Sequence, residues 1–119
     1  MKLPGIVLLS VVLYPLASSA NDFPTQARVE YVLGCMEENG GQSYNTLYPC
    51  VCSIDKIAEA MPYKAYEEAQ TLSVMIKTPG ERGGAFRDAP GARDRVKNFK
   101  QLNEDVRRMC WVNKPAPKQ

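Results

Sequence analysis

The 119-residue sequence contains no histidine. Ser-His-Asp and Cys-His catalysis, most zinc enzymes and His-ligated haem all depend on an imidazole group, so this absence excludes them. No cofactor fingerprint, internal repeat or low-complexity tract is present either. The sequence therefore predicts a protein that binds rather than catalyses, with no catalytic residue, no cofactor and no metal.

Long apolar runs are also missing. The longest, at residues 6–16, is shorter than the roughly 20 residues of a membrane span, and Pro15 interrupts it. It follows a basic residue and precedes small residues at 18–20, which is the order of a secretory signal. We expect residues 1–20 to be a signal peptide cleaved after Ala20, and the protein to be periplasmic or secreted, without membrane attachment.

Cysteines number only four, and they are Cys35, Cys50, Cys52 and Cys110. An even number in a small exported chain predicts two disulfides. On a helix Cys50 and Cys52 would point about 200° apart and could not readily pair with each other. Two connectivities stay open, either Cys35–Cys50 with Cys52–Cys110 or Cys35–Cys52 with Cys50–Cys110.

The Cys50-x-Cys52 motif has a second interpretation. Thiolate and thioether sulfurs suit Cu(I), and several methionines accompany the motif. A strained bridge at this motif would also exchange with other thiols. The cysteine spacing matches no zinc ribbon or finger. We favour structural disulfides and keep a copper or redox carrier as the alternative.

Apolar residues at helical spacing predict an all-α fold, a small bundle of about four short helices stapled by two disulfides. No stretch alternates apolar and polar residues for long enough to predict a strand. The helical domain is expected over residues 21–112, followed by a disordered tail at 113–119. The predicted helices cover residues 24–38, 62–77, 91–112 and a segment that begins between Ser43 and Pro49 and ends before Pro62. The predicted buried stripes include Val29, Val32, Leu33 and Met36 on the first helix, and Val96, Phe99, Leu102, Val106, Met109 and Cys110 on the last.

Charge is distributed unevenly along the chain. Residues 22–70 contain eight acidic and three basic side chains, whereas residues 71–119 contain five acidic and eleven basic ones. The two halves either pack against each other or offer a basic face to an acidic partner. Nucleic acid is not expected as a partner, because no aromatic and basic stacking pattern accompanies the arginines.

The segment 78–91 contains four glycines and two prolines, and we expect it to lack regular structure. It carries Phe86 between two pairs of arginine and acid, a composition typical of interface anchors. The alternative is that Phe86 enters the core and the arginines bond the loop's own carbonyls. The sequence predicts a binding surface for an acidic periplasmic protein, made of Arg82, Phe86, Arg87, Arg93 and Lys97.

Three segments of the chain resemble those of a known protein family. They are RVEYVLGCM (28–36), LYPCVCSIDKIA (47–58) and GERGGAFRD (80–88). The chain resembles a family of small uncharacterised periplasmic proteins of methylotrophic and related proteobacteria, associated with quinoprotein (PQQ-dependent) alcohol dehydrogenase systems and their cytochromes c. The resemblance covers about residues 28–111. It implies a non-enzymatic accessory protein that serves the dehydrogenase or its cytochrome c electron transfer. A periplasmic enzyme inhibitor or immunity-type protein is the alternative function.

Overall fold

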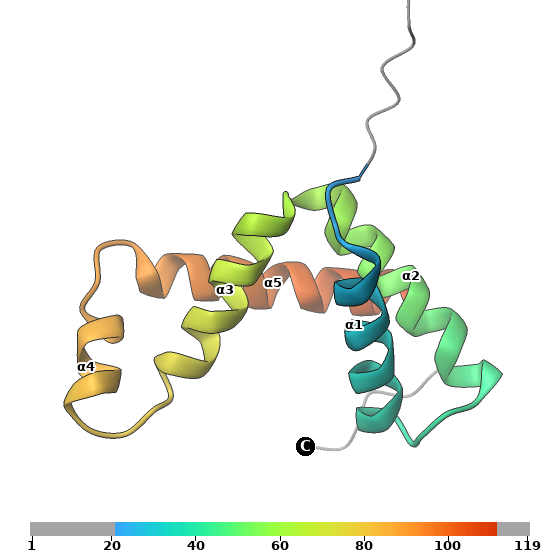
Figure 1. The fold of residues 1–119 in the computed structure, drawn as a ribbon, viewed down its shortest axis with the longest axis horizontal. Helices are drawn as coiled ribbons and strands as arrows, with labels where there is room; N and C mark the ends of the chain where they lie inside the picture. Colours follow the sequence, from blue (N-terminus) through green and yellow to red (C-terminus); the bar gives the residue numbers. More distant parts are fainter. Residues whose placement is uncertain (1–20, 112–119) are drawn as a thin grey trace, which may run out of the picture.

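The computed structural model describes residues 21–111, and the predicted signal peptide (1–20) and tail (113–119) lie outside this range. The described residues form five helices and no strand, so the predicted all-α fold is confirmed. The helices are α1 (Thr25–Glu38), α2 (Tyr44–Ala60), α3 (Tyr63–Met75), α4 (Glu81–Arg87) and α5 (Ala92–Cys110) (Figure 1). Within residues 21–111 no helix is both long enough and apolar enough to cross a lipid bilayer.

Local hydrogen bonds explain where the helices begin and end. Ser43 and Thr46 form a capping box at the start of α2, in which each side chain bonds the other residue's backbone N–H, at 3.1 and 3.3 Å. The backbone N–H of Tyr63, at the start of α3, donates to both carboxylate oxygens of Asp22. After α1, Gly41 adopts a φ of 95°, which favours glycine, and its N–H donates to the Met36 carbonyl.

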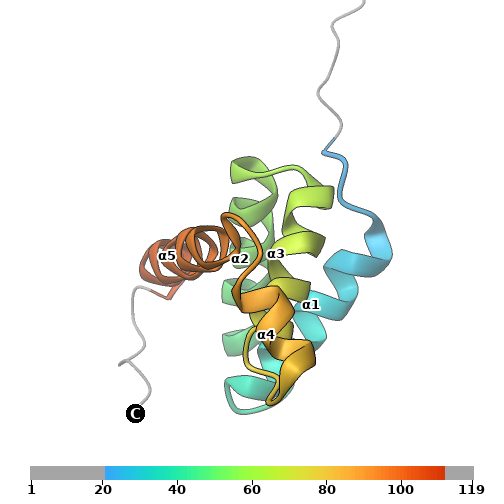
Figure 2. The ribbon, with the colours of Figure 1, turned by 90° about the vertical axis from the view of Figure 1, so that its left-hand side faces the viewer.

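The long helix α5 forms the base of the molecule. Helices α2 and α3 pack on α5, α1 packs on α2, and α4 contacts the facing ends of α3 and α5. In Figure 1, α3 and α1 lie in front of α5 and spread apart from each other, and Figure 2 shows α5 on the side opposite α1.

The core is small and joins distant parts of the chain. Its buried members are Phe23, Ile54, Ile57, Tyr66 and Val106. Phe23 lies just before α1, and its ring centroid is 5.1 Å from that of Tyr66, which lies 5.9 Å from the ring of Phe99 on α5. These aromatic contacts hold the start of the described chain against α3 and α5.

Part of the predicted buried stripes is wrong. Val29 and Leu33 on α1 are 51% and 47% exposed, and Met109 on α5 is 53% exposed. Met36 is buried and Val32 packs on the core, as predicted, and Tyr31, which the predicted stripe did not include, also packs on the core. Helix α1 is therefore rotated relative to the orientation that its apolar pattern indicates.

The four cysteines form two disulfides, as predicted, and the structure selects one of the two open connectivities. Cys35 bonds Cys50, and Cys52 bonds Cys110, with Cα atoms 5.8 Å apart in both bridges. Cys50 is fully buried and turns toward α1, whereas Cys52 lies on another side of α2 and reaches α5. The two bridges thus fix both neighbours of α2.

This pairing predicts how the thiols respond to alkylation. The native protein should gain no mass on alkylation, because all four cysteines are bonded. The variant Cys110→Ala should gain one adduct, and fragmentation mass spectrometry should place it on Cys52. An adduct on Cys50 of the variant would instead support the other connectivity. Adducts on the native protein would favour the metal or redox interpretation.

The segment 78–91 is more regular than predicted, because it contains α4. Gly80 and Gly91 flank the helix with positive φ values of 87° and 73°. The Arg87 guanidinium donates to the carbonyls of Ile76 and Thr78 at 3.1 Å and of Gly80 at 3.4 Å. These bonds tie α4 to the end of α3 and compensate for the low helix propensity of its two internal glycines.

Candidate functional site

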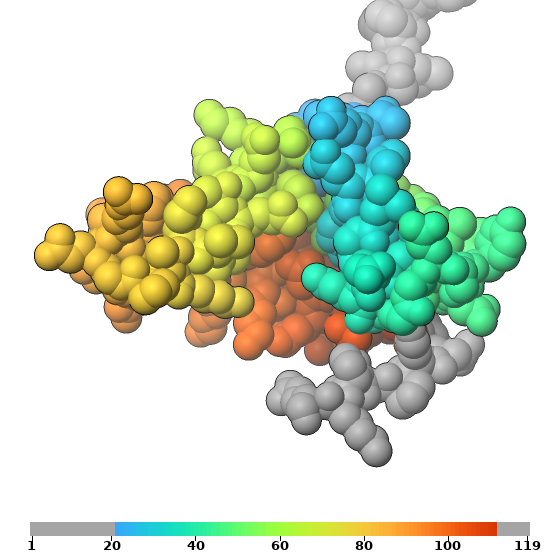
Figure 3. All heavy atoms as spheres, turned by 60° about the horizontal axis from the view of Figure 1, so that its bottom comes forward, coloured from blue at the N-terminus to red at the C-terminus, as the bar shows by residue number. Residues whose placement is uncertain are grey.

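A groove of about 620 Å³ runs between α1 and α3, with α5 at its base. Figure 3 shows the atoms of α5 between those of α3 and α1. Three carboxylates line the groove, those of Glu30, Glu38 and Glu67, and Arg107 is the one basic residue in the lining. Its aromatic residues are Tyr31, Tyr63, Tyr66 and Trp111. Acidic and aromatic side chains thus dominate the chemistry of the groove.

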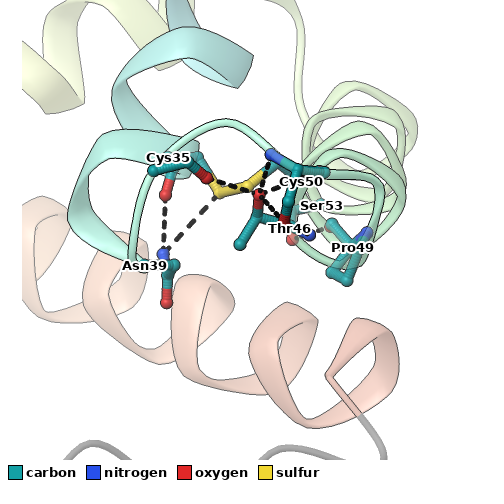
Figure 4. Close-up of a disulfide and its surroundings, with 8 residues drawn as sticks. Cys35, Asn39, Thr46, Pro49, Cys50 and Ser53 are labelled. Atoms are coloured by element: carbon teal, nitrogen blue, oxygen red, sulfur yellow. Dashed lines mark hydrogen bonds between the residues drawn. A yellow bond between two sulfur atoms is a disulfide. The ribbon is translucent and has the colours of Figure 1, made fainter.

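The α1 wall of the groove is held by the Cys35–Cys50 bridge. Cys35 lines the groove, and its partner Cys50 is buried beneath it in α2. Asn39, which also lines the groove, donates from Nδ2 to the Cys35 carbonyl at 2.7 Å (Figure 4). The hydroxyl of Thr46 donates to the Gly41 carbonyl at 2.7 Å, which fixes the turn between α1 and α2. This wall is therefore preformed.

The α3 wall is ordered by hydrogen bonds along the helix. The Tyr63 hydroxyl donates to Glu67 Oε1 at 3.1 Å, and Gln70 Nε2 donates to the Tyr66 hydroxyl at 2.7 Å. The rings of Tyr63 and Tyr66 lie 6.2 Å apart. Since Asp22 holds the first turn of α3, both walls are fixed by contacts from elsewhere in the chain.

The pKa values of three groove tyrosines are raised, mainly because the rings are partly or fully buried. Burial raises the pKa of Tyr66 to about 12, and the neighbouring Tyr31, Tyr63 and Glu30 add to this rise. Partial burial and the hydrogen bond to Glu67 raise the pKa of Tyr63. Burial also raises the pKa of Tyr31, with Glu38 adding to the rise and Arg107 opposing it. The phenols consequently stay neutral at physiological pH and add no charge to the carboxylates.

The surface predicted from the sequence lies at the other end of the molecule, on α4 and the start of α5. Arg82, Phe86, Arg93 and Lys97 are exposed there, and Phe86 lies outside the core. Arg82 and Phe86 are one turn apart on α4, as are Arg93 and Lys97 on α5, so each pair shares a helix face. The structure links the two elements through Arg93, whose Nε donates to the Arg87 carbonyl at 3.3 Å.

Arg87 differs from the other four residues of the predicted surface. It is partly buried, and its guanidinium is engaged with backbone carbonyls. This is the arrangement that the alternative interpretation gave for the arginines of the segment. Arg87 therefore positions α4, and the exposed side chains of the predicted surface are those of the remaining four residues.

The Cys50-x-Cys52 motif has both of its sulfurs in disulfides to other helices. Thiolate ligation or thiol exchange at the motif would first require a bridge to open. Within residues 21–111 no group of three or more Cys, Asp or Glu residues is arranged to hold a metal ion.

Sequence reasoning missed an exposed aromatic pair on α2. The rings of Tyr44 and Tyr48 stack with centroids 6.0 Å apart and are 74% and 69% exposed. Val51 continues the same face one turn later and is 39% exposed. The spacing of these residues at i, i+4 and i+7 is the signal that could have identified them.

Comparisons with known protein families, with characterised proteins and with solved structures find no match.

Proposed function

We propose that this chain is a non-enzymatic binding protein of the periplasm that docks on an acidic protein partner through its α4–α5 end. The observation that carries the proposal is the exposure of Phe86 beside three exposed basic residues, Arg82, Arg93 and Lys97. A partly exposed aromatic ring supplies apolar area to an interface, and nearby positive charge steers an acidic partner toward it. The partners implied by the resemblance are a quinoprotein alcohol dehydrogenase and its cytochrome c.

The construction of this end supports a docking role. Three carbonyl bonds from Arg87 and one from Arg93 hold α4 in place. Phe86 and Arg82 are therefore presented on an ordered helix, which lowers the entropic cost of binding compared with a flexible loop. Two disulfides suit an oxidising compartment, which accords with the signal peptide expected at residues 1–20.

The docking proposal predicts distinct effects of two substitutions on binding kinetics. Phe86→Ala should weaken binding roughly tenfold, mainly through faster dissociation, because it removes buried apolar contact. Lys97→Glu should slow association and reduce its dependence on salt, because it removes steering charge. Capture from a periplasmic extract identifies the partner, and surface plasmon resonance against that partner measures both rates.

Two matched variants control for the loss of an apolar side chain and for the change of charge as such, at positions away from the α4–α5 end. Met109→Ala removes an exposed apolar side chain near the other end of α5, and Lys64→Glu makes the same charge change on α3. Both should bind like the parent protein. If the controls weaken binding as much as Phe86→Ala and Lys97→Glu do, the partner does not use the α4–α5 end.

A further inference from the structure

The carboxylates of the groove are spread along its length. Glu30 and Glu38 line it from α1 and are eight residues apart, which corresponds to about 12 Å along the helix axis. Glu67 lines the opposite wall from α3. A ligand that satisfies these groups must therefore carry positive charge at more than one position.

The groove carboxylates are not neutralised by the protein. Within residues 21–111 the ion pairs are Arg28–Asp55, Lys56–Glu59 and Asp105–Arg108, and none involves a groove glutamate. Glu30 accepts a hydrogen bond from Gln26, and Glu67 accepts one from Tyr63, but both donors are uncharged. With three carboxylates and one guanidinium in its lining, the groove has a net charge of −2.

Aromatic rings line the groove together with the carboxylates. Tyr31 and Tyr63 are partly exposed, and Trp111 also lines the groove. The faces of such rings attract ammonium groups and give apolar contact to the methylene groups between them. The volume of about 620 Å³ lies within the range of small-molecule sites.

From this combination we infer that the groove binds a linear polyamine, a small organic cation whose ammonium groups are separated by short alkyl chains. The terminal ammonium groups bond the carboxylates of Glu30 and Glu38, and Glu67 faces the middle of the ligand. The methylene groups lie against Tyr31 and Tyr63. This binding site is separate from the α4–α5 end and does not depend on docking there.

The chemistry disfavours other small ligands. A monoamine would satisfy one carboxylate and leave the others unpaired, and an anion would meet a net negative potential. A zwitterion would need Arg107 as a partner for its negative group. The role of Arg107 therefore distinguishes a pure cation, which it repels, from a zwitterion, which it would attract.

Isothermal titration calorimetry of the full-length mature protein with spermidine tests the inference, with n-butylamine as the monoamine control. Spermidine should bind with a stoichiometry of one, at least tenfold more tightly than n-butylamine, and its affinity should fall as salt is added. The absence of saturable spermidine binding at low salt would overturn the inference. Equal affinities for spermidine and n-butylamine would also overturn it. So would a protein that binds a lysine-rich peptide, titrated in the same way, but does not bind spermidine.

Substitutions then locate the site. Glu38→Gln and Glu30→Gln should each weaken spermidine binding roughly fivefold, the contribution of about one exposed ion pair. Glu37→Gln is the matched control, because it makes the same charge change one residue from Glu38 at an exposed position outside the groove lining. It should leave the affinity nearly unchanged, and equal losses from Glu37→Gln and Glu38→Gln would show non-specific attraction instead of a site.

Arg107→Gln provides a test that a purely structural effect would not mimic. Removing the one basic group of the lining should tighten spermidine binding about threefold, since it repels the ligand. Weaker binding in this variant would contradict a cation site and indicate a ligand with a negative group. Circular dichroism and thermal unfolding of each variant establish that the fold is retained, as expected for polar substitutions at exposed positions.

Discussion

Removing the bridge between Cys52 and Cys110 is expected to lower the free energy of unfolding by about 4 kcal/mol. The two cysteines are 58 residues apart in sequence, so the bridge removes much conformational freedom from the unfolded chain. It also fastens α2 to the end of α5, close to the buried Val106. Urea unfolding of Cys52→Ala/Cys110→Ala under non-reducing conditions measures the effect.

The other bridge gives a comparison within the same protein. Cys35 and Cys50 are 15 residues apart, and the same loop-entropy argument gives about 3 kcal/mol for Cys35→Ala/Cys50→Ala. Because this bridge also holds the α1 wall, its removal should weaken spermidine binding. An unfolding midpoint of Cys52→Ala/Cys110→Ala within error of the parent would show that the longer bridge has no structural role.

Local sequence signals predicted most of the helix boundaries correctly. Ser43, Pro62 and the Asn-Gly-Gly sequence at 39–41 act within one helical turn, through caps and positive φ angles, so their effect can be read without knowledge of the tertiary structure. The exclusion of a Cys50–Cys52 bridge was predictable for the same reason. The choice between the two remaining connectivities was not, because it depends on which side of α2 each neighbouring helix occupies.

The rotation of α1 could not be predicted from its apolar pattern. The apolar stripe through Val29 and Leu33 predicted the buried face, yet these residues are about half exposed. The Cys35–Cys50 bridge turns Cys35 toward α2, and the rings of Phe23 and Tyr66 occupy space beside the start of α1. A covalent constraint and an aromatic cluster thus decide the orientation, and neither is part of the periodic pattern.

The groove was missed because its two walls come from separate helices. Adjacent residues on a helix do not face one another, so the pairs Glu37-Glu38 and Glu67-Glu68 give no sign of a shared site. In the structure one member of each pair, Glu38 and Glu67, lines the groove between α1 and α3. The sequence contains a partial signal, the tyrosines and glutamates at helical spacing on each helix. Their convergence follows only from the packing of α1 on α2 and of α3 on α5.

Substitution of Gly83 by Ala is expected to lower the free energy of unfolding by about 2 kcal/mol, as overpacking of a close contact does. Gly83 is buried, and a Cβ atom there would lie 1.8 Å from the Thr78 carbonyl oxygen. That oxygen accepts a hydrogen bond from Arg87, so displacing it loosens the bonds that hold α4 to the end of α3. Glycine is therefore needed at position 83 because the Thr78 carbonyl lies so close to its backbone, and not because of its φ angle.

Gly84→Ala is the matched control, because its Cβ would meet no atom closer than Arg87 Nη2 at 3.6 Å. This variant should unfold at a slightly higher urea concentration, since Ala favours a helix over Gly by roughly 1 kcal/mol. Equal shifts in the same direction for the two variants would contradict the close packing of Gly83 against Thr78.

The same pair of variants separates the two proposed binding sites. No residue of α4 lines the groove, whereas Arg82 and Phe86 stand on α4 itself. Gly83→Ala should therefore weaken docking of the protein partner several-fold while leaving the affinity for spermidine within error of the parent. Gly84→Ala should change neither. Surface plasmon resonance and calorimetry on the same preparations measure both affinities, and a parallel loss of the two in Gly83→Ala would mean that α4 and the groove form one cooperative unit.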